Sequence, residues 1–133
     1  MLVPLLVVDA ANVVGSVPDG WWKDRAVAAR RLRDALVVVA GEGLTSERAP
    51  AELREGPIQV ILVVEGQARG VEAVYGVAVV SAAGSGDDAI VEVVAQRDKG
   101  TEWFVATADR ELSDRVRAHG ARVIGPRTIP RRP

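Results

Sequence analysis

The chain of 133 residues contains no cysteine, and only Lys23 and Lys99 among its 17 basic residues are lysines. The absence of cysteine excludes both a disulfide framework and a zinc site built on thiolates. The other basic residues are arginines, whose planar guanidinium groups favour bidentate contacts with phosphate. Because the formal net charge is −1, the molecule as a whole is not a polycation attracted to nucleic acid. Phosphate binding would have to come from local groups of arginines.

A long hydrophobic segment is also lacking. The apolar run at residues 1–8 stops at Asp9, has no basic lead-in and no A-x-A cleavage pattern, and is too short to cross a bilayer. We therefore expect neither a signal peptide nor a membrane anchor, and a cytoplasmic location. Hydrophobic residues make up 48% of the chain and charged residues 26%, which is typical of a globular protein. We expect a single domain at residues 1–125 and an irregular basic tail at 126–133.

Continuous apolar runs alternate with segments of helical periodicity along the chain. The runs predict strands at 2–8, 58–64, 74–80, 102–107 and 121–124. Apolar residues at steps of three and four predict helices at 21–40, 87–97 and 109–119. Strands without alternating polar residues are buried on both faces, as in a parallel sheet. The pattern therefore predicts an α/β fold with right-handed crossovers and helices on both faces of the sheet.

Acidic residues follow several of these expected strands. Asp9 ends the first strand, Glu65 ends the second, and Asp109 follows the fourth. The segment GSGDDAIVEVV at 84–94 places Asp87 and Asp88 at the start of a helix. Ligands of open α/β sheets bind beyond the carboxyl ends of the strands, so we expect these side chains to share one edge of the sheet.

Carboxylates that meet at one edge repel each other unless a cation is present. Oxygen ligands without His or Cys suit a hard cation such as Mg²⁺ or Mn²⁺, which polarises a phosphodiester and activates water. Asn12, three residues after Asp9, supplies a neutral amide that could orient this acid or a water molecule. Glu92 lies one helical turn after Asp88 and could reach the same cleft.

Each of these residues also has an ordinary structural explanation. A strand-end Asp commonly caps a loop or a helix, and Glu65 before Gly66 is typical of a turn. Asp87 lies next to Gly86 and is placed to cap the helix, whereas Asp88, one step further in, is placed to face Asp9 and Asp109. The three tryptophans could stack on bases, but core packing is the better interpretation of each.

Four segments of the chain resemble a known family. They are VVDAANVVG at 7–15, GSGDDAIVEVV at 84–94, VATADREL at 105–112 and HGARVIGP at 119–126. In this order they are similar to the NYN branch of the PIN-like ribonucleases, and within it to the YacP-like bacterial group. The resemblance implies strand order 3-2-1-4-5, an acidic pocket that binds Mg²⁺ or Mn²⁺, and endonucleolytic cleavage of single-stranded RNA.

The resemblance also implies roles for individual residues. Asp9, Asp88 and Asp109 would be the metal-handling acids, with Asn12 as their orienter and Asp87 as an additional metal ligand. Some relatives carry a further Asp where this chain has Ser113, and Asp114 lies one step further round the helix. Glu92, Ser113 and Asp114 are therefore the candidate accessory residues.

Arginines supply the candidate contacts with RNA. They are Arg30, Arg31, Arg33, Arg110 and Arg127, with further arginines in the tail. The main alternative to an endoribonuclease is a weakly catalytic RNA-binding or ribosome-associated module, which Ser113 favours. Its partner could be the ribosome or a regulatory protein, and an oligomer is compatible with the sequence. A haloacid-dehalogenase phosphohydrolase would need a second Asp where Ala11 stands, and GSGDDA lacks the G-x-G-x-x-G of a dinucleotide-binding loop.

Overall fold

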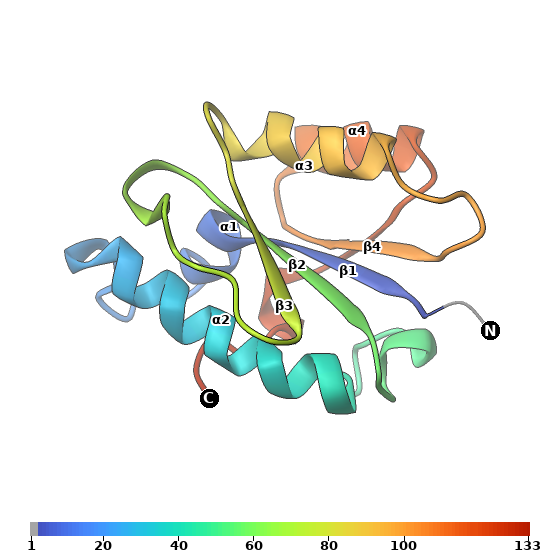
Figure 1. Cartoon of the computed structure of the whole chain (residues 1–133), viewed down its shortest axis with the longest axis horizontal. Coiled ribbons are helices and arrows are strands. Elements are labelled where there is room, and N and C mark those ends of the chain that lie inside the picture. The colour runs from blue at the N-terminus through green and yellow to red at the C-terminus, as the bar shows by residue number, and fades with distance from the viewer. Residues whose placement is uncertain (1–2) are drawn as a thin grey trace.

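Five parallel strands form the central sheet of the computed structural model, which describes residues 3–133. They are β1 (Leu5–Asp9), β2 (Gln59–Val64), β3 (Val77–Ser81), β4 (Trp103–Ala106) and β5 (Arg122–Ile124). The strand order is β3-β2-β1-β4-β5, and every neighbouring pair is parallel (Figure 1). The α/β fold and the strand order predicted from the sequence are confirmed.

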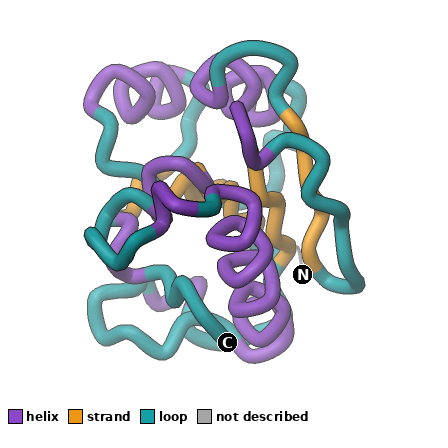
Figure 2. Tube along the Cα trace, turned by 90° about the vertical axis from the view of Figure 1, so that its left-hand side faces the viewer, coloured by secondary structure: helices purple, strands orange, loops and turns teal. Residues whose placement is uncertain are grey.

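Four helices cover the two faces of this sheet. They are α1 (Ala10–Val14), α2 (Arg25–Glu42), α3 (Gly86–Ala95) and α4 (Arg110–Ala118). The first two lie on one face and the last two on the other (Figure 1), so the strands lie between two layers of helices (Figure 2). No helix within residues 3–133 combines the length and the hydropathy that a membrane span requires.

The central strand β1 supplies side chains to both hydrophobic cores. Leu6 and Val8 belong to the core under α1 and α2, whereas Leu5 and Val7 belong to the core under α3 and α4. This two-sided burial explains why the sequence of the strand is continuously apolar. The strand begins at Leu5 rather than at residue 2, which lies outside the described residues.

The second helix starts later than the sequence predicts. Trp21–Lys23 forms a separate 3₁₀ turn, and Asp24 then adopts an extended conformation and caps α2 through a 3.0 Å bond from the Val27 N–H. The expected start at residue 21 is therefore wrong. The short helix α1 was not expected either, because its first-turn cap is Asp9, which also ends a strand.

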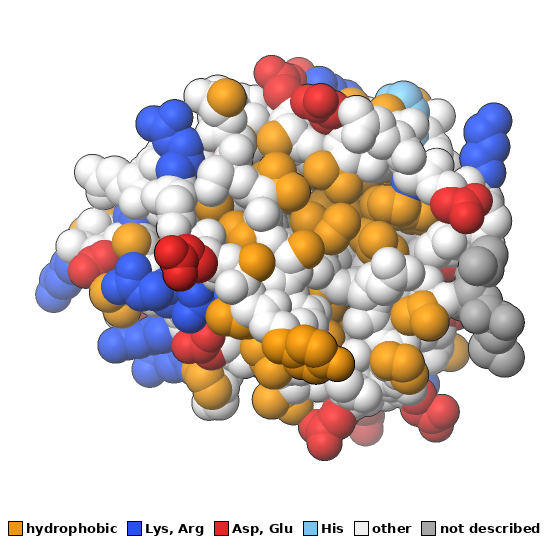
Figure 3. Space-filling model, in the orientation of Figure 1, with side chains coloured by type: hydrophobic (Ala, Val, Ile, Leu, Met, Phe, Trp, Pro, Cys, Tyr) orange, Lys and Arg blue, Asp and Glu red, His pale blue; other side chains and the backbone are white. Residues whose placement is uncertain are grey.

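The edge strand β3 is less well covered than the centre of the sheet. Ala78 is exposed, and Val79 and Val80 are only partly buried. Figure 3 shows hydrophobic side chains gathered between α3 and this strand. The neighbouring side chains Ile61 and Val91 are also partly buried. This face is the most apolar part of the molecular surface in that view.

The segment 126–133 is more ordered than an irregular tail. Pro126–Thr128 forms a 3₁₀ turn, and Ile129 is buried in the core under α1 and α2. Beyond it, Arg131 and Arg132 both form ion pairs with Asp19. The expectation of an irregular segment is therefore wrong for residues 126–128, and the segment is held against the domain.

Candidate active site

Asp9 lies at the end of β1 and is almost fully buried, with 5% of its surface exposed. Its Oδ1 accepts a long hydrogen bond of 3.5 Å from the Asn12 N–H and so caps α1. Its Oδ2 accepts a hydrogen bond of 3.0 Å from the Thr107 hydroxyl. The cap and the buried hydroxyl together fix the orientation of this carboxylate.

Thr107 connects the ends of the first and fourth strands. Its Oγ1 donates to Asp9 and accepts a hydrogen bond of 3.2 Å from the Asp109 N–H. The residue is buried and lies directly after β4. Sequence reasoning did not select Thr107, although it stands inside VATADREL between a strand and an acid. The sequence signal for Thr107 is a hydroxyl at the end of a buried strand, because a buried hydroxyl needs a polar partner such as a nearby acid.

Asn12 holds the loop between β4 and α4. Its side-chain oxygen accepts a hydrogen bond of 2.9 Å from the Ala108 N–H, and only its backbone N–H reaches Asp9. The amide side chain therefore positions the loop that carries Asp109, and does not itself orient the carboxylate of Asp9. This corrects the role expected for Asn12.

Asp109 caps α4 by accepting a hydrogen bond of 2.9 Å from the Leu112 N–H. Ser113 lies one turn further on, is buried, and donates its hydroxyl to the Asp109 carbonyl at 2.7 Å. Ser113 therefore places a small side chain at the accessory position, and the hydroxyl of this side chain donates its hydrogen bond within its own helix. Asp114 points away, with 84% of its side chain exposed, and lies 4.0 Å from Arg117.

The start of α3 is built differently from the prediction. Ser85 is the cap, and its hydroxyl accepts a hydrogen bond of 3.1 Å from the Asp88 N–H. The Gly86 N–H donates to the Glu65 carboxylate. A Cβ on Gly86 would lie 2.7 Å from that carboxylate oxygen, so the glycine permits the close approach. The expectation that Asp87 is the cap is therefore wrong.

This register reverses the roles expected for the two adjacent acids. Asp88 is turned outward, with 74% of its side chain exposed, and its Oδ1 forms a 2.9 Å ion pair with Arg115. Asp87 is half-buried, and burial, followed by repulsion from Asp109 and Glu65, raises its pKa. Glu92 is exposed one turn below Asp88 and follows it to the outer side. The structure thus brings Asp87 into the site in place of Asp88.

We use the name acidic edge for Asp9, Glu65, Asp87 and Asp109. Burial is the main cause that raises the pKa of Asp9 to about 6, and the charges of Asp87 and Glu65 add to it. The hydrogen bonds from Thr107 and Asn12 oppose this increase. Burial also raises the pKa of Asp87, followed by repulsion from Asp109 and Glu65, while Arg115 opposes it. Glu65, interpreted from the sequence as a turn residue, therefore belongs to the site electrostatically.

The acidic edge matches a divalent cation in donor type and in charge. All its side-chain donors are carboxylate oxygens, which are the ligands that Mg²⁺ and Mn²⁺ prefer. Within residues 3–133, however, no three His, Cys, Asp or Glu side chains are arranged closely enough to hold an ion as they stand. Asp9 and Asp109 each use one oxygen as a helix cap. The carboxylate donors are suited to the cation, but their oxygens do not converge on one point.

The candidate RNA-binding arginines differ in their availability. Arg33 is engaged with the Asp34 carboxylate at 3.0 Å and the Glu72 carbonyl at 2.9 Å, and only 14% of its side chain is exposed. Arg127 donates to the Ser16 carbonyl at 3.3 Å. Arg30, Arg31 and Arg110 are exposed. The structure thus separates Arg33, which is a structural residue, from arginines that can reach a ligand.

Among the comparisons with known proteins, only the comparison of structures finds a match. No family model and no curated protein sequence matches the chain. The crystal structure of Rae1 (YacP) from Bacillus subtilis matches with a TM-score of 0.71 and 21% identity, over 93% of this chain and 70% of that one. A tryptophan-to-leucine variant of the same protein matches with a TM-score of 0.67 and 18% identity, over 94% and 71%. The chain therefore has the fold of YacP, as the motifs that resemble the YacP-like branch predict.

Proposed function

We propose that this protein is an endoribonuclease of the YacP-like branch that hydrolyses single-stranded RNA with Mg²⁺ or Mn²⁺. The observation that carries the proposal is the crowding of the acidic edge, where burial, followed by the charges of the neighbouring acids, raises the pKa of Asp9 and Asp87. This crowding lies at the edge of the sheet where folds of this class bind ligands. Like charges gathered there lower the stability of the empty site and favour a cation.

Asp9, Asp87 and Asp109 would hold the cation, with Glu65 beside them. When bound, the cation would polarise the phosphodiester and lower the pKa of a water molecule. The protein's own part is positioning: Thr107 fixes Asp9, and Asn12 fixes the loop that carries Asp109. Because Asp9 has a pKa of about 6, cation binding has to displace a proton from it in weakly acidic solution.

A second candidate function is an RNA-binding or ribosome-associated module that cleaves poorly. Two observations favour it. The acids within residues 3–133 do not form a ready three-ligand group, and Ser113 supplies no carboxylate to the site. In this case the arginine contacts with single-stranded RNA would remain, while hydrolysis would be slow.

A cleavage assay on labelled single-stranded RNA tests the proposal. We expect cleavage with Mn²⁺ or Mg²⁺ and its loss in EDTA. Asp87→Asn should reduce the rate at least about a hundredfold, which is the usual scale for loss of an electrostatic catalytic group. Asp88→Asn is the matched control, because this neighbouring acid faces Arg115, and it should cleave like the parent.

The outcomes separate the two candidates. RNA binding without metal-dependent cleavage would support the second function. Cleavage that survives EDTA, or equal activity of the Asp87→Asn variant and the parent, would contradict the proposed site. A protein that neither binds nor cleaves single-stranded RNA would contradict both functions.

A further inference from the structure

Two cavities meet at Trp21. The apolar cavity has a volume of about 280 Å³, and its lining includes Ala10, Ala11, Val14, Trp21, Glu65 and Gly84. Glu65 belongs to the acidic edge, and Ala10 directly follows Asp9. The apolar cavity therefore opens beside the proposed cleavage site, and most of its wall is hydrocarbon.

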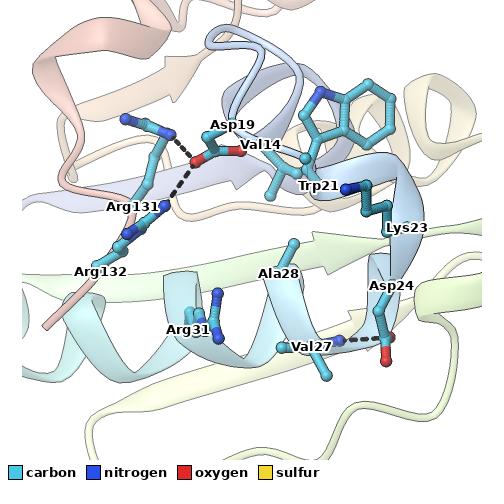
Figure 4. A pocket seen from close by; sticks show the side chains of 11 residues that line it. Val14, Asp19, Trp21, Lys23, Asp24, Val27, Ala28, Arg31, Arg131 and Arg132 are labelled. Atoms are coloured by element: carbon cyan, nitrogen blue, oxygen red, sulfur yellow. Dashed lines mark hydrogen bonds and ion pairs between the residues drawn. The ribbon is translucent and has the colours of Figure 1, made fainter.

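The basic cavity lies on the other side of the same tryptophan and also has a volume of about 280 Å³. Four cationic side chains line it: Lys23, Arg31, Arg131 and Arg132 (Figure 4). The acids in its wall are Asp19 and Asp24. The positive charges therefore exceed the negative ones by two.

The two acids of the basic cavity are already engaged. Asp24 accepts the capping hydrogen bond from the Val27 N–H. Asp19 accepts hydrogen bonds from Arg131 at 2.5 Å and from Arg132 at 3.2 Å, as the dashed lines in Figure 4 show. One carboxylate thus holds two guanidinium groups in place and leaves donors on both. Fixed arginines of this kind are suited to a phosphodiester.

Trp21 forms part of the wall of both cavities. Its ring lies edge-on to Trp22, with centroids 6.0 Å apart, and the Arg25 guanidinium lies 5.1 Å from its centroid. Trp22 itself is 51% exposed. Two tryptophans beside a group of arginines are the components of a single-strand binding surface, in which bases stack on rings and phosphates contact cations.

We infer that single-stranded RNA crosses Trp21, with a nucleobase in the apolar cavity and the neighbouring phosphate in the basic cavity. The inference rests on the proposed function for the position of the cleaved phosphodiester at the acidic edge. The acidic edge repels the phosphates of an RNA substrate. Binding of the strand at Trp21 would offset this repulsion. An uncharged base held beside Glu65 is not repelled by it, and a phosphate held beyond Trp21 is bound on the side away from the acidic edge.

Binding measured without cleavage tests this inference. None of Asp9, Asp87 and Asp109, which would hold the cation, lines either cavity, so anisotropy of a labelled RNA oligonucleotide can be followed in EDTA. Trp21→Leu should weaken binding by about 5- to 100-fold, the effect expected for loss of one base–aromatic stack. Trp21→Phe keeps a ring and should recover part of the affinity, which guards against a mere folding defect.

Two further arms assign the parts of the nucleotide. An abasic position moved along the oligonucleotide should weaken binding to the parent at one position and have no additional effect on Trp21→Leu. The double variant Arg131→Gln, Arg132→Gln should flatten the slope of log affinity against log salt by about 0.7, the value for the one phosphate that the basic cavity holds. Arg117→Gln, an exposed arginine on α4, should leave the slope unchanged.

The results also distinguish this inference from the proposed function. Metal-dependent cleavage by the parent, with unchanged RNA affinity in the Trp21 and arginine variants, would overturn the inference and leave the enzyme in place. Affinity that depends on Trp21 in a protein that does not cleave would support the inference and overturn the enzyme. Absence of any RNA binding by the parent would overturn the inference.

Discussion

The acidic edge and the basic cavity use charge in opposite ways. The acidic edge gathers four carboxylates, and Arg115, whose charge lowers the pKa of Asp87, is already paired with Asp88 on the outer side of α3. The basic cavity gathers four cations, but Asp19 shares its charge between two of them. A net charge of −1 therefore conceals two regions of opposite excess charge. Because the two regions are not paired with each other, each keeps an excess charge that is available to a ligand of opposite sign.

The largest expected effect is on the stability of the metal-free protein. Burial raises the pKa of Asp9 from 3.8 to about 6, so the unfolded chain ionises first as the pH rises, and the stability of the folded protein falls between these values. The full difference corresponds to about 3 kcal/mol. Asp9→Asn should therefore stabilise the metal-free protein by up to this amount at pH 7.5.

Urea denaturation of both proteins in EDTA measures this effect. Near pH 3.5 the parent and Asp9→Asn should differ little, because the carboxyl is protonated in the folded state and mostly protonated in the unfolded state. An Asp9→Asn variant that is less stable than the parent at pH 7.5 would show that the capping and Thr107 hydrogen bonds outweigh the burial of charge.

The next effect comes from the cation itself. Mn²⁺ at a hundredfold excess over its dissociation constant should stabilise the protein by about 2.7 kcal/mol, by mass action. The gain should shrink at pH 5, where a proton competes for Asp9. Thermal melting with and without Mn²⁺ measures it, and Asp87→Asn should lose the gain. If Mn²⁺ leaves the melting temperature unchanged at pH 7.5, the result would contradict cation binding at the acidic edge.

Thr107→Val should cost about 2 kcal/mol, because it leaves a buried carboxylate oxygen and the Asp109 N–H without their partner. The pKa of Asp9 should rise further, since the Thr107 hydrogen bond lowers it in the parent. Thr107→Ser keeps the hydroxyl and is the matched control. Equal unfolding free energies for the Val and Ser variants would mean that the bridge between the two strand ends contributes nothing.

The smallest expected effect is on the salt dependence of RNA binding at the basic cavity. Arg31→Gln should reduce the salt slope of RNA binding by less than about 0.7, whereas Arg33→Gln should leave it unchanged because Arg33 is held by Asp34 and Glu72. Anisotropy titrations at four salt concentrations resolve this difference. A slope that depends on Arg33 and not on Arg31 would place the RNA on the other side of α2.

The sequence predicts the sheet and the acidic edge because both follow from long, regular patterns. Buried parallel strands read as continuous apolar runs, and their carboxyl ends meet at one edge whatever the details of the loops. Asp9 and Asp109 could therefore be assigned to this edge from their places after β1 and β4. Whether the edge binds a cation remains a prediction.

The register of α3 could not be predicted in the same way. Ser85 and Asp87 are both good caps, and two residues of difference rotate every following side chain by about 200°. The choice depends on the approach of Glu65 to Gly86, a contact between segments 21 residues apart. Arg33 illustrates the same limit, because its engagement with Glu72 comes from the fold rather than from its neighbours on the helix.

The Thr107 hydroxyl carries a single hydrogen, so it can donate to only one neighbour at a time. In the structure this hydrogen points to the Asp9 carboxylate, and the oxygen accepts from the Asp109 N–H. When Asp9 takes up a proton on Oδ1, its Oδ2 still accepts from the Thr107 hydroxyl. The hydrogen-bonded bridge between the two strand ends is therefore compatible with both charge states of Asp9. The loop after β4 does not have to move when this carboxyl titrates.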